Sequence, residues 1–600
     1  MRAIDKLAAS LVFASTAVWV GALLAVLNGA LVPWVAWAAL LAGAAVGAIA
    51  ARGTAAAGTM APREVPAETA ASLVARFQGL PRTDTGLRSA ASAKDTVLND
   101  CVLGRLEALA LTAFAVVSLR QFGWLLYERG DLLLTLLPNN YGDLPLHWTY
   151  VQHFAGGAPF WPDNPIAVGE RLQYPLGVDF LTALLVVVGV GSRVVWPLLG
   201  LAGAAAAALA LRRWGGALAV AGFLFSGGLA GLQLLWTGRL LDYQDAVAWK
   251  NLYLALFVPQ RGFLLALPVG LLLLWSWRRR LLRGEAALPA WVEGVLWGAL
   301  PLVHLHSFLL ASVVYAAWAL GARRLEAAWP SLAWALVPAT WGVWQVSDGF
   351  RAVSLVGWQP GWVMGDENPL AFLAVNFGLF LPLAVAALAL AWRERRREEL
   401  LVLGPALAMF AMLFLVRLAP WAWDNTKVLL WCYLLALPPI GSLLLARLRR
   451  PWQVVAVAGL LFSGAVSVTA ACLGRGPRLE VLSLSEYDAV CEALASRPLT
   501  ERVAVAPTFN HPVALCGHPL VLGYPGHLWS HGIDASEVEP KLEALLRGEP
   551  GWSENARIIG ARLLFWGPRE DAAFPGSYRP WEDDRDLLAS GTWGKVYVLD

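Results

Sequence analysis

The sequence predicts a polytopic α-helical membrane protein with about 13 transmembrane helices and a small C-terminal α/β domain. Of its 600 residues, 58% are hydrophobic and 15% are charged, whereas soluble domains carry about 25% charged residues. The mean hydropathy is +0.57. The 31 tryptophans suit aromatic belts at two membrane interfaces. The net charge of +3 is too small to indicate a nucleic-acid partner.

The predicted spans follow from apolar runs, because a transmembrane helix needs about 20 predominantly apolar residues. Such runs lie near 7–28, 31–51, 106–127, 194–211, 216–235, 262–277, 288–303, 307–322, 330–346, 371–392, 400–417, 428–446 and 452–472. The start of the chain mimics a signal peptide, but a second apolar run follows at once. We therefore expect an uncleaved N-terminal hairpin over 1–51. The polar segment 52–104 is predicted to be a cytoplasmic linker.

The positive-inside rule orients the predicted transmembrane domain, 105–476. Its strongest basic clusters all fall on one side when the spans alternate, and they are Arg278–Arg280 with Arg283, Arg393–Arg397 and Arg447–Arg450. The large loop 128–175 then faces the outer side, as does the C-terminal region. The apolar segment 176–190 breaks the alternation and contains Asp179. We predict that this segment is re-entrant or interfacial.

The C-terminal region, 477–600, alternates strand-like and helix-like segments. Strands are expected over 502–507, 562–567 and 595–599, and a helix over 537–546. None of the five cysteines has metal-binding spacing. Cys491 and Cys516 pair if this domain lies in an oxidising compartment, and two free thiols are the alternative.

A polar stretch, 139–148, follows directly on a predicted span and begins the large outer loop. Charged and histidine side chains are costly near a bilayer, so their presence there indicates a chemical task. His147 lies four residues after Asp143, which places both on one face of a helix. Asp143 either caps the start of that helix or acts chemically. Both interpretations stay open.

Basic residues recur on the predicted outer side, against the overall charge bias. They are Arg239, Lys250, Arg261, Arg351, Arg417 and Lys427. Arg120 lies inside a span, near its outer end. Taken singly, each one either snorkels or pairs with a carboxylate. Taken together, they indicate an anionic ligand at the outer leaflet, such as a lipid-linked phosphate.

His304 and His306 lie where two predicted spans meet on the outer side. Such a pair binds a metal only with further ligands, and the sequence offers no convincing third one. Hydrogen bonding to a substrate or to a helix end is favoured.

Two acidic positions allow two interpretations each. Asp424 either caps a span at its outer end or pairs with Lys427, which itself is a candidate phosphate ligand. Asp366 and Glu367 form either a divalent-metal site or the start of a capped helix.

Several motifs together carry a family resemblance. They are Tyr141-Gly142-Asp143-Leu144-Pro145-Leu146-His147, Asp163-Asn164-Pro165 with Tyr174-Pro175, Pro259-Gln260-Arg261-Gly262, His304-Leu305-His306-Ser307, Trp423-Asp424-Asn425-Thr426-Lys427, and Asn510-His511-Pro512 with Gly523-Tyr524 and Trp529-Ser530-His531-Gly532. From about residue 100 onwards the chain resembles the GT-C class of integral membrane glycosyltransferases. Within that class it is similar to a bacterial membrane protein family.

The resemblance implies a polyprenyl-phosphate-linked sugar donor, a glycan, lipid or protein acceptor, and Asp143 as general base. It also implies a multi-pass protein of the bacterial inner membrane, with the C-terminal domain extracytoplasmic. Asp143 lacks the paired acidic neighbour of metal-dependent members, because Gly142 precedes it. A requirement for Mg²⁺ or Mn²⁺ therefore stays open.

The expected mechanism is direct displacement with inversion at the anomeric carbon. Arg261, Lys427 or Arg120 would stabilise the departing phosphate. His147, His304, His306 and Asp424 are expected to bind substrate. His511, His527 and His531 are candidates for acceptor binding in the C-terminal domain, or are solvated loop residues.

Two alternative functions remain. One is a transporter or flippase of a lipid-linked glycan or another anion, and the other is a non-catalytic GT-C-like scaffold. The sequence shows no internal repeat and no paired broken helices in corresponding halves of the chain, which transporters often contain. A glycosyltransferase is therefore the leading hypothesis.

Overall fold

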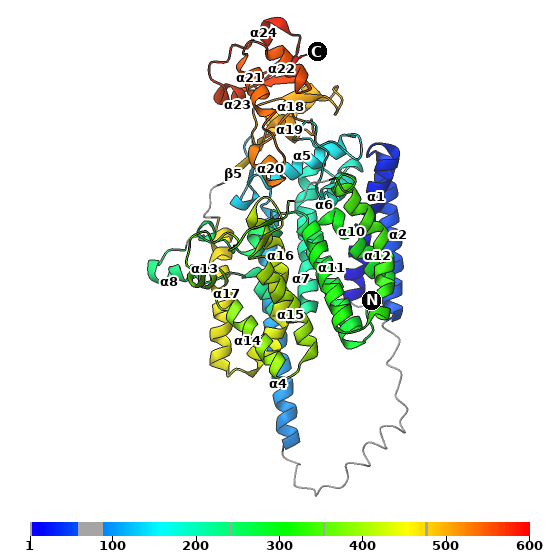
Figure 1. The fold of residues 1–600 in the computed structure, drawn as a ribbon, viewed down its shortest axis with the longest axis vertical. Helices are drawn as coiled ribbons and strands as arrows, with labels where there is room; N and C mark the ends of the chain where they lie inside the picture. The colour runs from blue at the N-terminus through cyan, green and yellow to red at the C-terminus, as the bar shows by residue number, and fades with distance from the viewer. Residues whose placement is uncertain (1–2, 58–87, 241, 352–354, 475–477, 600) are drawn as a thin grey trace.

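The computed structural model describes residues 3–57, 88–240, 242–351, 355–474 and 478–599. The chain begins with a hairpin of α1 (Ala3–Asn28) and α2 (Pro33–Ala57), followed by α4 (Arg88–Gly123). Residues 58–87 of the predicted linker lie outside the described residues. In Figure 1 the helical bundle forms the body of the molecule, and the C-terminal elements cover one end of it.

The described part contains six helices that are long and apolar enough to cross a membrane, or seven if one bent pair counts as a span. The bent pair is α13 (Pro369–Phe377) and α14 (Phe380–Arg393), which meet at 92°. Besides the bent pair and the three helices already named, the bundle contains α7 (Ser192–Leu224), α9 (Phe263–Trp277), α10 (Ala290–Val303), α11 (Leu305–Gly321), α12 (Leu325–Val346), α15 (Arg397–Met412), α16 (Thr426–Pro439) and α17 (Arg450–Cys472). The count of thirteen spans stays a prediction.

The predicted runs 194–211 and 216–235 meet in the single helix α7, which ends at Leu224. Its helical geometry breaks at Gly215 and Gly216, and Gly216 has φ +61°. A left-handed glycine bends the chain without forming the loop that two separate spans would need. Residues 225–235 leave the helix and contain only short turns, including the start of α8 (Gln233–Thr237).

Close packing within the bundle depends on small side chains at the helix contacts. A Cβ at Gly298 of α10 would lie 2.4 Å from Pro338 Cγ of α12, and one at Gly203 of α7 would lie 2.9 Å from the Leu264 carbonyl of α9. Glycine therefore lets these helix pairs approach closely.

The segment that breaks the alternation of spans contains α6 (Gly177–Val187), a helix of 11 residues. Its length of about 16 Å is roughly half the hydrocarbon thickness of a bilayer. α6 packs against α1, α2, α5 and α7, and this packing buries Asp179 beneath the outer loop.

The outer loop contains β1 (Tyr127–Arg129), β2 (Leu132–Thr135) and α5 (Asp143–Ala155). β2 pairs antiparallel with β5 (Leu479–Ser483) at the start of the C-terminal region, giving a sheet of order β1-β2-β5. Further along, Arg502 donates to the carbonyl of Asn164 at 3.0 Å and His153 Nδ1 donates to the carbonyl of Gly517 at 2.7 Å. The C-terminal region is thus fastened to the outer loop at several points.

The C-terminal region has a four-stranded sheet of order β6-β7-β9-β8. Its strands are β6 (Arg502–Ala504), β7 (Ala561–Trp566), β8 (Leu587–Gly591) and β9 (Gly594–Val598). β6 and β7 are parallel, whereas β7–β9 and β9–β8 are antiparallel. The helices around it are α18 (Leu484–Leu494), α19 (Pro512–Leu515), α20 (Pro525–Ser530), α21 (Glu539–Arg547), α22 (Trp552–Ile558), α23 (Pro568–Ala573) and α24 (Trp581–Asp584). The expected strands coincide with β6, β7 and β9, and the expected helix with α21; β5 and β8 were not expected.

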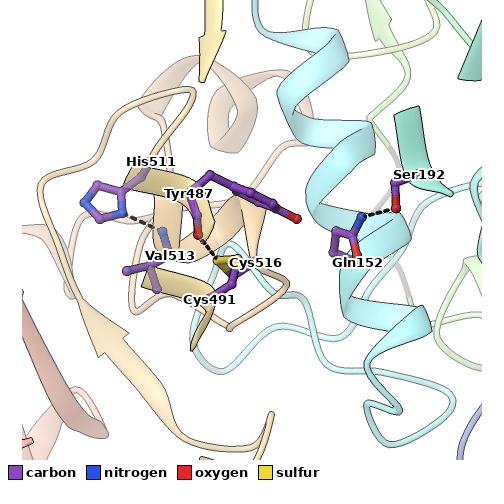
Figure 2. Close-up of a disulfide and its surroundings, with 7 residues drawn as sticks. All are labelled: Gln152, Ser192, Tyr487, Cys491, His511, Val513 and Cys516. Carbon is purple, nitrogen blue, oxygen red and sulfur yellow. Dashed lines mark hydrogen bonds between the residues drawn. A yellow bond between two sulfur atoms is a disulfide. The ribbon is translucent and has the colours of Figure 1, made fainter. Parts of the chain in front are cut away.

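Cys491 of α18 and Cys516, which follows α19, form a disulfide (Figure 2). The bond closes a segment with a sequence separation of 25 residues, which is worth about 3 kcal/mol in the chain-entropy model. Of the two alternatives for these cysteines, the structure has the pair. Cys432 and Cys472 are free thiols.

Candidate active site

Asp143 is the first residue of α5, and its carboxylate has no fixed partner. The N-cap position is held by Gly142, with φ +72° and no side chain that caps. The capping interpretation of Asp143 is therefore wrong, because the carboxylate lies one residue inside the helix. In the described part of the chain, no hydrogen bond or ion pair engages it. An unengaged carboxylate at a helix start is free to accept a proton or a ligand.

Charged neighbours surround Asp143. Burial raises the pKa of its carboxyl group, the charges of His147 and Lys427 oppose that rise, and Asp424 adds to it. The fold thus brings together two pairs of residues, Asp143 with His147 and Asp424 with Lys427, that are far apart from one another in the sequence. A carboxylate with a raised pKa is a stronger base at neutral pH than an ordinary aspartate.

His147 is held by a buried carboxylate on α6. Its Nδ1 donates to Asp179 Oδ2 at 2.7 Å, and both side chains are buried. This hydrogen bond fixes the orientation of the imidazole ring. Nε2 of His147 has no hydrogen-bond partner in the described residues. His147, whose Nε2 is thus unpaired, is also the residue whose charge opposes the rise in the pKa of Asp143.

Arg261 balances the charge of Asp179. Its Nε lies 3.5 Å from Asp179 Oδ1, and its Nη2 donates to Thr182 Oγ1 at 2.8 Å. The guanidinium group also lies over the ring of Trp196, 3.9 Å from the centroid. Arg261 is therefore engaged on several sides, and it reaches the Asp143 cluster through Asp179 and His147.

Lys427 is the cation of this cluster. Its Nζ lies 2.9 Å from Asp424 Oδ2, so Asp424 is its ion-pair partner. The capping interpretation of Asp424 is wrong, because Asn425 holds the N-cap position of α16. The charge of Lys427 acts on His304, His306 and His531 as well as on Asp143.

His304 caps α11, as the helix-end interpretation predicts. Its Nδ1 accepts from the Ser307 amide at 3.2 Å, and its ring lies 4.2 Å from that of Phe263. The ring of His306 lies 5.8 Å away from that of His304. The described residues contain no group of three or more His, Cys, Asp or Glu that could hold a metal ion.

Two histidines of the C-terminal region also reach the cluster, on and next to α20. A Cβ at Gly142 would lie 3.2 Å from His527 Nε2, and the ring of His531 lies 5.1 Å from that of Tyr174. Burial, with a smaller contribution from the charge of His147, lowers the pKa of His527 to about 4. Burial, followed by the charges of His527, Lys427 and His147, lowers the pKa of His531 to about 3. Both imidazoles are therefore neutral at pH 7.

Three predicted site residues lie elsewhere. Arg120 Nε donates to the carbonyl of Cys472 at 3.0 Å, at the end of α17, and its guanidinium lies over Trp124. Asp366 and Glu367 are exposed in the loop before α13. The capped helix start at that loop is made by the neighbouring Asn368, whose side chain accepts from two amides. Among their described contacts, nothing joins these three residues to Asp143.

No protein-family model matches the sequence. No curated protein matches it either. Similar solved structures include crystal structures of the Archaeoglobus fulgidus oligosaccharyltransferase. Its apo form has a TM-score of 0.40 and 14% identity, covering 77% of this chain and 69% of that chain. The form tethered with an acceptor peptide containing the NVT sequon has a TM-score of 0.40 and 14% identity, covering 82% and 74%.

Proposed function

We propose that this protein is a membrane glycosyltransferase of the bacterial inner membrane, which transfers a sugar from a polyprenyl-phosphate donor to an acceptor on the outer side. The observation that carries the proposal is the unengaged, half-buried carboxylate of Asp143, which is acted on by the charge of Lys427. This arrangement offers a base and a phosphate ligand to one pair of substrates. Acceptors of suitable chemistry are hydroxyl-bearing glycans, lipids or proteins.

A single carboxylate is sufficient for this reaction. A lipid phosphate leaves readily, whereas an alkoxide leaves poorly and obliges most glycosidases to use two carboxyl groups. Asp143 accepts the proton of the acceptor hydroxyl, and the acceptor oxygen forms a bond to the anomeric carbon. The bond from that carbon to the phosphate oxygen breaks, and its electron pair stays on the phosphate. Direct displacement inverts the anomeric centre.

Lys427 stabilises the negative charge that grows on the departing phosphate. The neighbouring neutral imidazoles of His306 and His531 supply N–H donors to phosphate oxygens without adding a competing charge. Arg261 acts as a positioning residue, because its charge holds Asp179, which orients His147. Arg120 has no part in this proposal, since its guanidinium is engaged at the end of α17.

The experiment that tests the proposal is a transfer assay on the full chain in lipid nanodiscs. Polyprenyl-phosphate hexoses and pentoses serve as donors, an envelope extract supplies acceptors, and released polyprenyl phosphate is quantified. We expect Asp143→Asn to lower the release rate by about 10²- to 10⁴-fold, the usual contribution of a general base. Asp366→Asn, at an exposed carboxylate outside the cluster, is the matched control and retains the rate.

Equal release by Asp143→Asn and the parent protein would refute the role of Asp143. If the folded protein releases polyprenyl phosphate from no donor, the proposal fails as a whole. In that case the transporter and scaffold hypotheses gain weight, and lipid movement across proteoliposomes separates those two.

A further inference from the structure

An apolar groove of about 750 Å³ runs along the surface between α11 and α12, beside α10. On α11 it extends from Phe308 to Leu320, and on α12 from Leu325 to Val343. At a rise of about 1.5 Å per residue, the α12 wall is about 27 Å long. The groove is therefore nearly as long as the hydrocarbon core of a bilayer, which is about 30 Å thick.

The walls of the groove present almost no polar group that needs a partner. Tyr315 Oη donates to the carbonyl of Ala328 at 2.6 Å. Ser312 Oγ donates to the carbonyl of Phe308 at 2.8 Å and accepts from Trp297 Nε1 at 3.1 Å. Large apolar side chains on its rim are exposed, Trp329 by 62% and Leu320 by 64%. Such a surface on a membrane protein contacts hydrocarbon chains.

A polar pocket of about 200 Å³ adjoins the outer end of the groove. Its lining residues are Arg171, Trp344, Gln345, Asp348, Gly349 and Arg351. The two cavities share one stretch of chain, because Val343 and Phe350 of the groove are sequence neighbours of the pocket residues. A long apolar groove thus ends in a polar head-group pocket.

The pocket carries an excess of positive charge. Arg171 Nη1 lies 3.3 Å from Asp348 Oδ1, which neutralises one guanidinium. The side chain of Arg351 is exposed and has no ion-pair partner in the described residues. Nε of Arg171 is buried and has no hydrogen-bond partner there either. Unused arginine donors and one excess positive charge suit a phosphate group.

The turn that forms this pocket has an unusual backbone. Asp348, Gly349 and Phe350 have φ values of +46°, +68° and +65°. A bulky residue such as phenylalanine rarely adopts positive φ, and such strain often marks a ligand site. In this conformation Phe350 lines the groove while Asp348 and Arg351 line the pocket.

We infer that pocket and groove together are a docking site for a long-chain polyprenyl phosphate. The phosphate binds Arg171 and Arg351, and the isoprenoid chain lies between α11 and α12. A phospholipid acyl chain reaches only about 15 Å, half of the hydrocarbon core, so it would leave much of the groove empty. The inference rests on the proposed function and says where the lipid part of the donor or product is held. The outer end of the groove, at Phe308, lies two residues from His306 of the reaction site.

The test measures lipid binding to the full chain in detergent by native mass spectrometry, with undecaprenyl phosphate and phosphatidylglycerol as probes. Ala316→Trp fills the groove from an exposed position, and Val313→Trp on the same helix, outside the groove, is its control. Arg351→Ala removes the free guanidinium, and Arg239→Ala, an exposed arginine outside the pocket, is its control. We expect each test variant to weaken binding of undecaprenyl phosphate by about tenfold, and neither control to do so.

Equal binding of undecaprenyl phosphate by Ala316→Trp and Val313→Trp would overturn the inference, as would equal binding of phosphatidylglycerol. Asp143→Asn separates this inference from the proposed function, because it should lower transfer by about 10²- to 10⁴-fold while binding the lipid normally. Selective binding by a protein that never transfers sugar would refute the function and retain the docking site. If the protein transfers sugar but its groove variants bind undecaprenyl phosphate as tightly as the parent, the docking site is refuted and the proposed function is retained.

Discussion

Two buried histidine–carboxylate pairs, one in the outer loop and one in the C-terminal domain, differ in what surrounds them. Glu570 accepts from His511 Nε2 at 3.0 Å and from the amides of Ala506 and Gly567 at 2.8 and 3.0 Å. The other ring nitrogen of His511 accepts from the Val513 amide (Figure 2). Every polar atom of this pair thus has a partner within its own domain.

The His147–Asp179 pair is less completely satisfied. Asp179 Oδ1 is buried without a hydrogen bond and has only the ion pair with Arg261 at 3.5 Å. Nε2 of His147 has no partner in the described residues. Because an unsatisfied buried polar group costs about 1–3 kcal/mol, such atoms persist where a ligand completes them. We therefore predict that the first pair serves stability and that the second takes part in the proposed chemistry.

The largest effect is expected from Glu570→Ala. This substitution leaves His511 and two backbone amides without their acceptor, which should cost about 3–5 kcal/mol of stability. Hydrogen exchange of β6 and β7 in the full chain measures the loss. Molecules that remain folded should transfer sugar at the parental rate. A parental stability would contradict the structural assignment of this pair.

Removal of the disulfide tests how much a second feature of the C-terminal region contributes to its stability. Cys491→Ser together with Cys516→Ser should lower the stability of the C-terminal domain by about 3 kcal/mol. Thermal unfolding of the parent protein, with and without reductant, provides the matched measurement. Reductant should lower the unfolding temperature of the parent and leave the double variant unchanged. A double variant that unfolds at the parental temperature would contradict the prediction.

His147→Ala tests the chemical side. Asp179 keeps Arg261 as its partner, so the fold should survive, whereas transfer should fall by about 10²-fold with the loss of the imidazole. His511→Ala is the matched substitution and should affect stability more than the transfer rate per folded molecule. If the two variants respond alike in both assays, the distinction between the pairs does not hold.

The smallest effect is one of pH. His527 and His531 have pKa values lowered to about 4 and about 3, whereas a detached α20 would titrate near 6.5. The detached state therefore binds more protons as the pH falls below about 6.5, and the contact of α20 with the outer loop weakens. Hydrogen exchange of α20, corrected for intrinsic rates, should be at least about tenfold faster at pH 5 than at pH 7. His531→Gln should reduce this dependence, and an unchanged profile would contradict the prediction.

Apolar runs located the helices of the bundle well, because lipid contact imposes hydrophobicity over whole segments. The prediction of a separate span over 216–235 was wrong, because composition does not distinguish a kinked helix such as α7 from two spans. β5 was missed because its partner, β2, lies in a different predicted domain. Pairing between distant segments leaves no local signal in a short strand.

In the candidate site, too, some residues could be predicted from the sequence and others could not. Asp143, His147, Asp424 and Lys427 are polar residues in apolar surroundings, and this local contrast made them visible. The partnership of Asp179 with His147 joins two segments across 32 residues and could not be predicted. Nor could the approach of His527, since a helix of six residues gives no sign of what it covers.

The pairing of β2 with β5 also bears on how the protein is made. Asp131 and Ser483, which are hydrogen-bonded beside these strands, are separated by 352 residues. At about 5–20 residues per second, a ribosome needs roughly 20 to 70 s to synthesise the intervening chain. Until then one edge of β2 has no partner, and an open edge invites pairing with the wrong chain. Assembly of the candidate site is therefore among the last events of biogenesis, and a prematurely terminated chain would lack His527, which lies next to Gly142 at the start of α5.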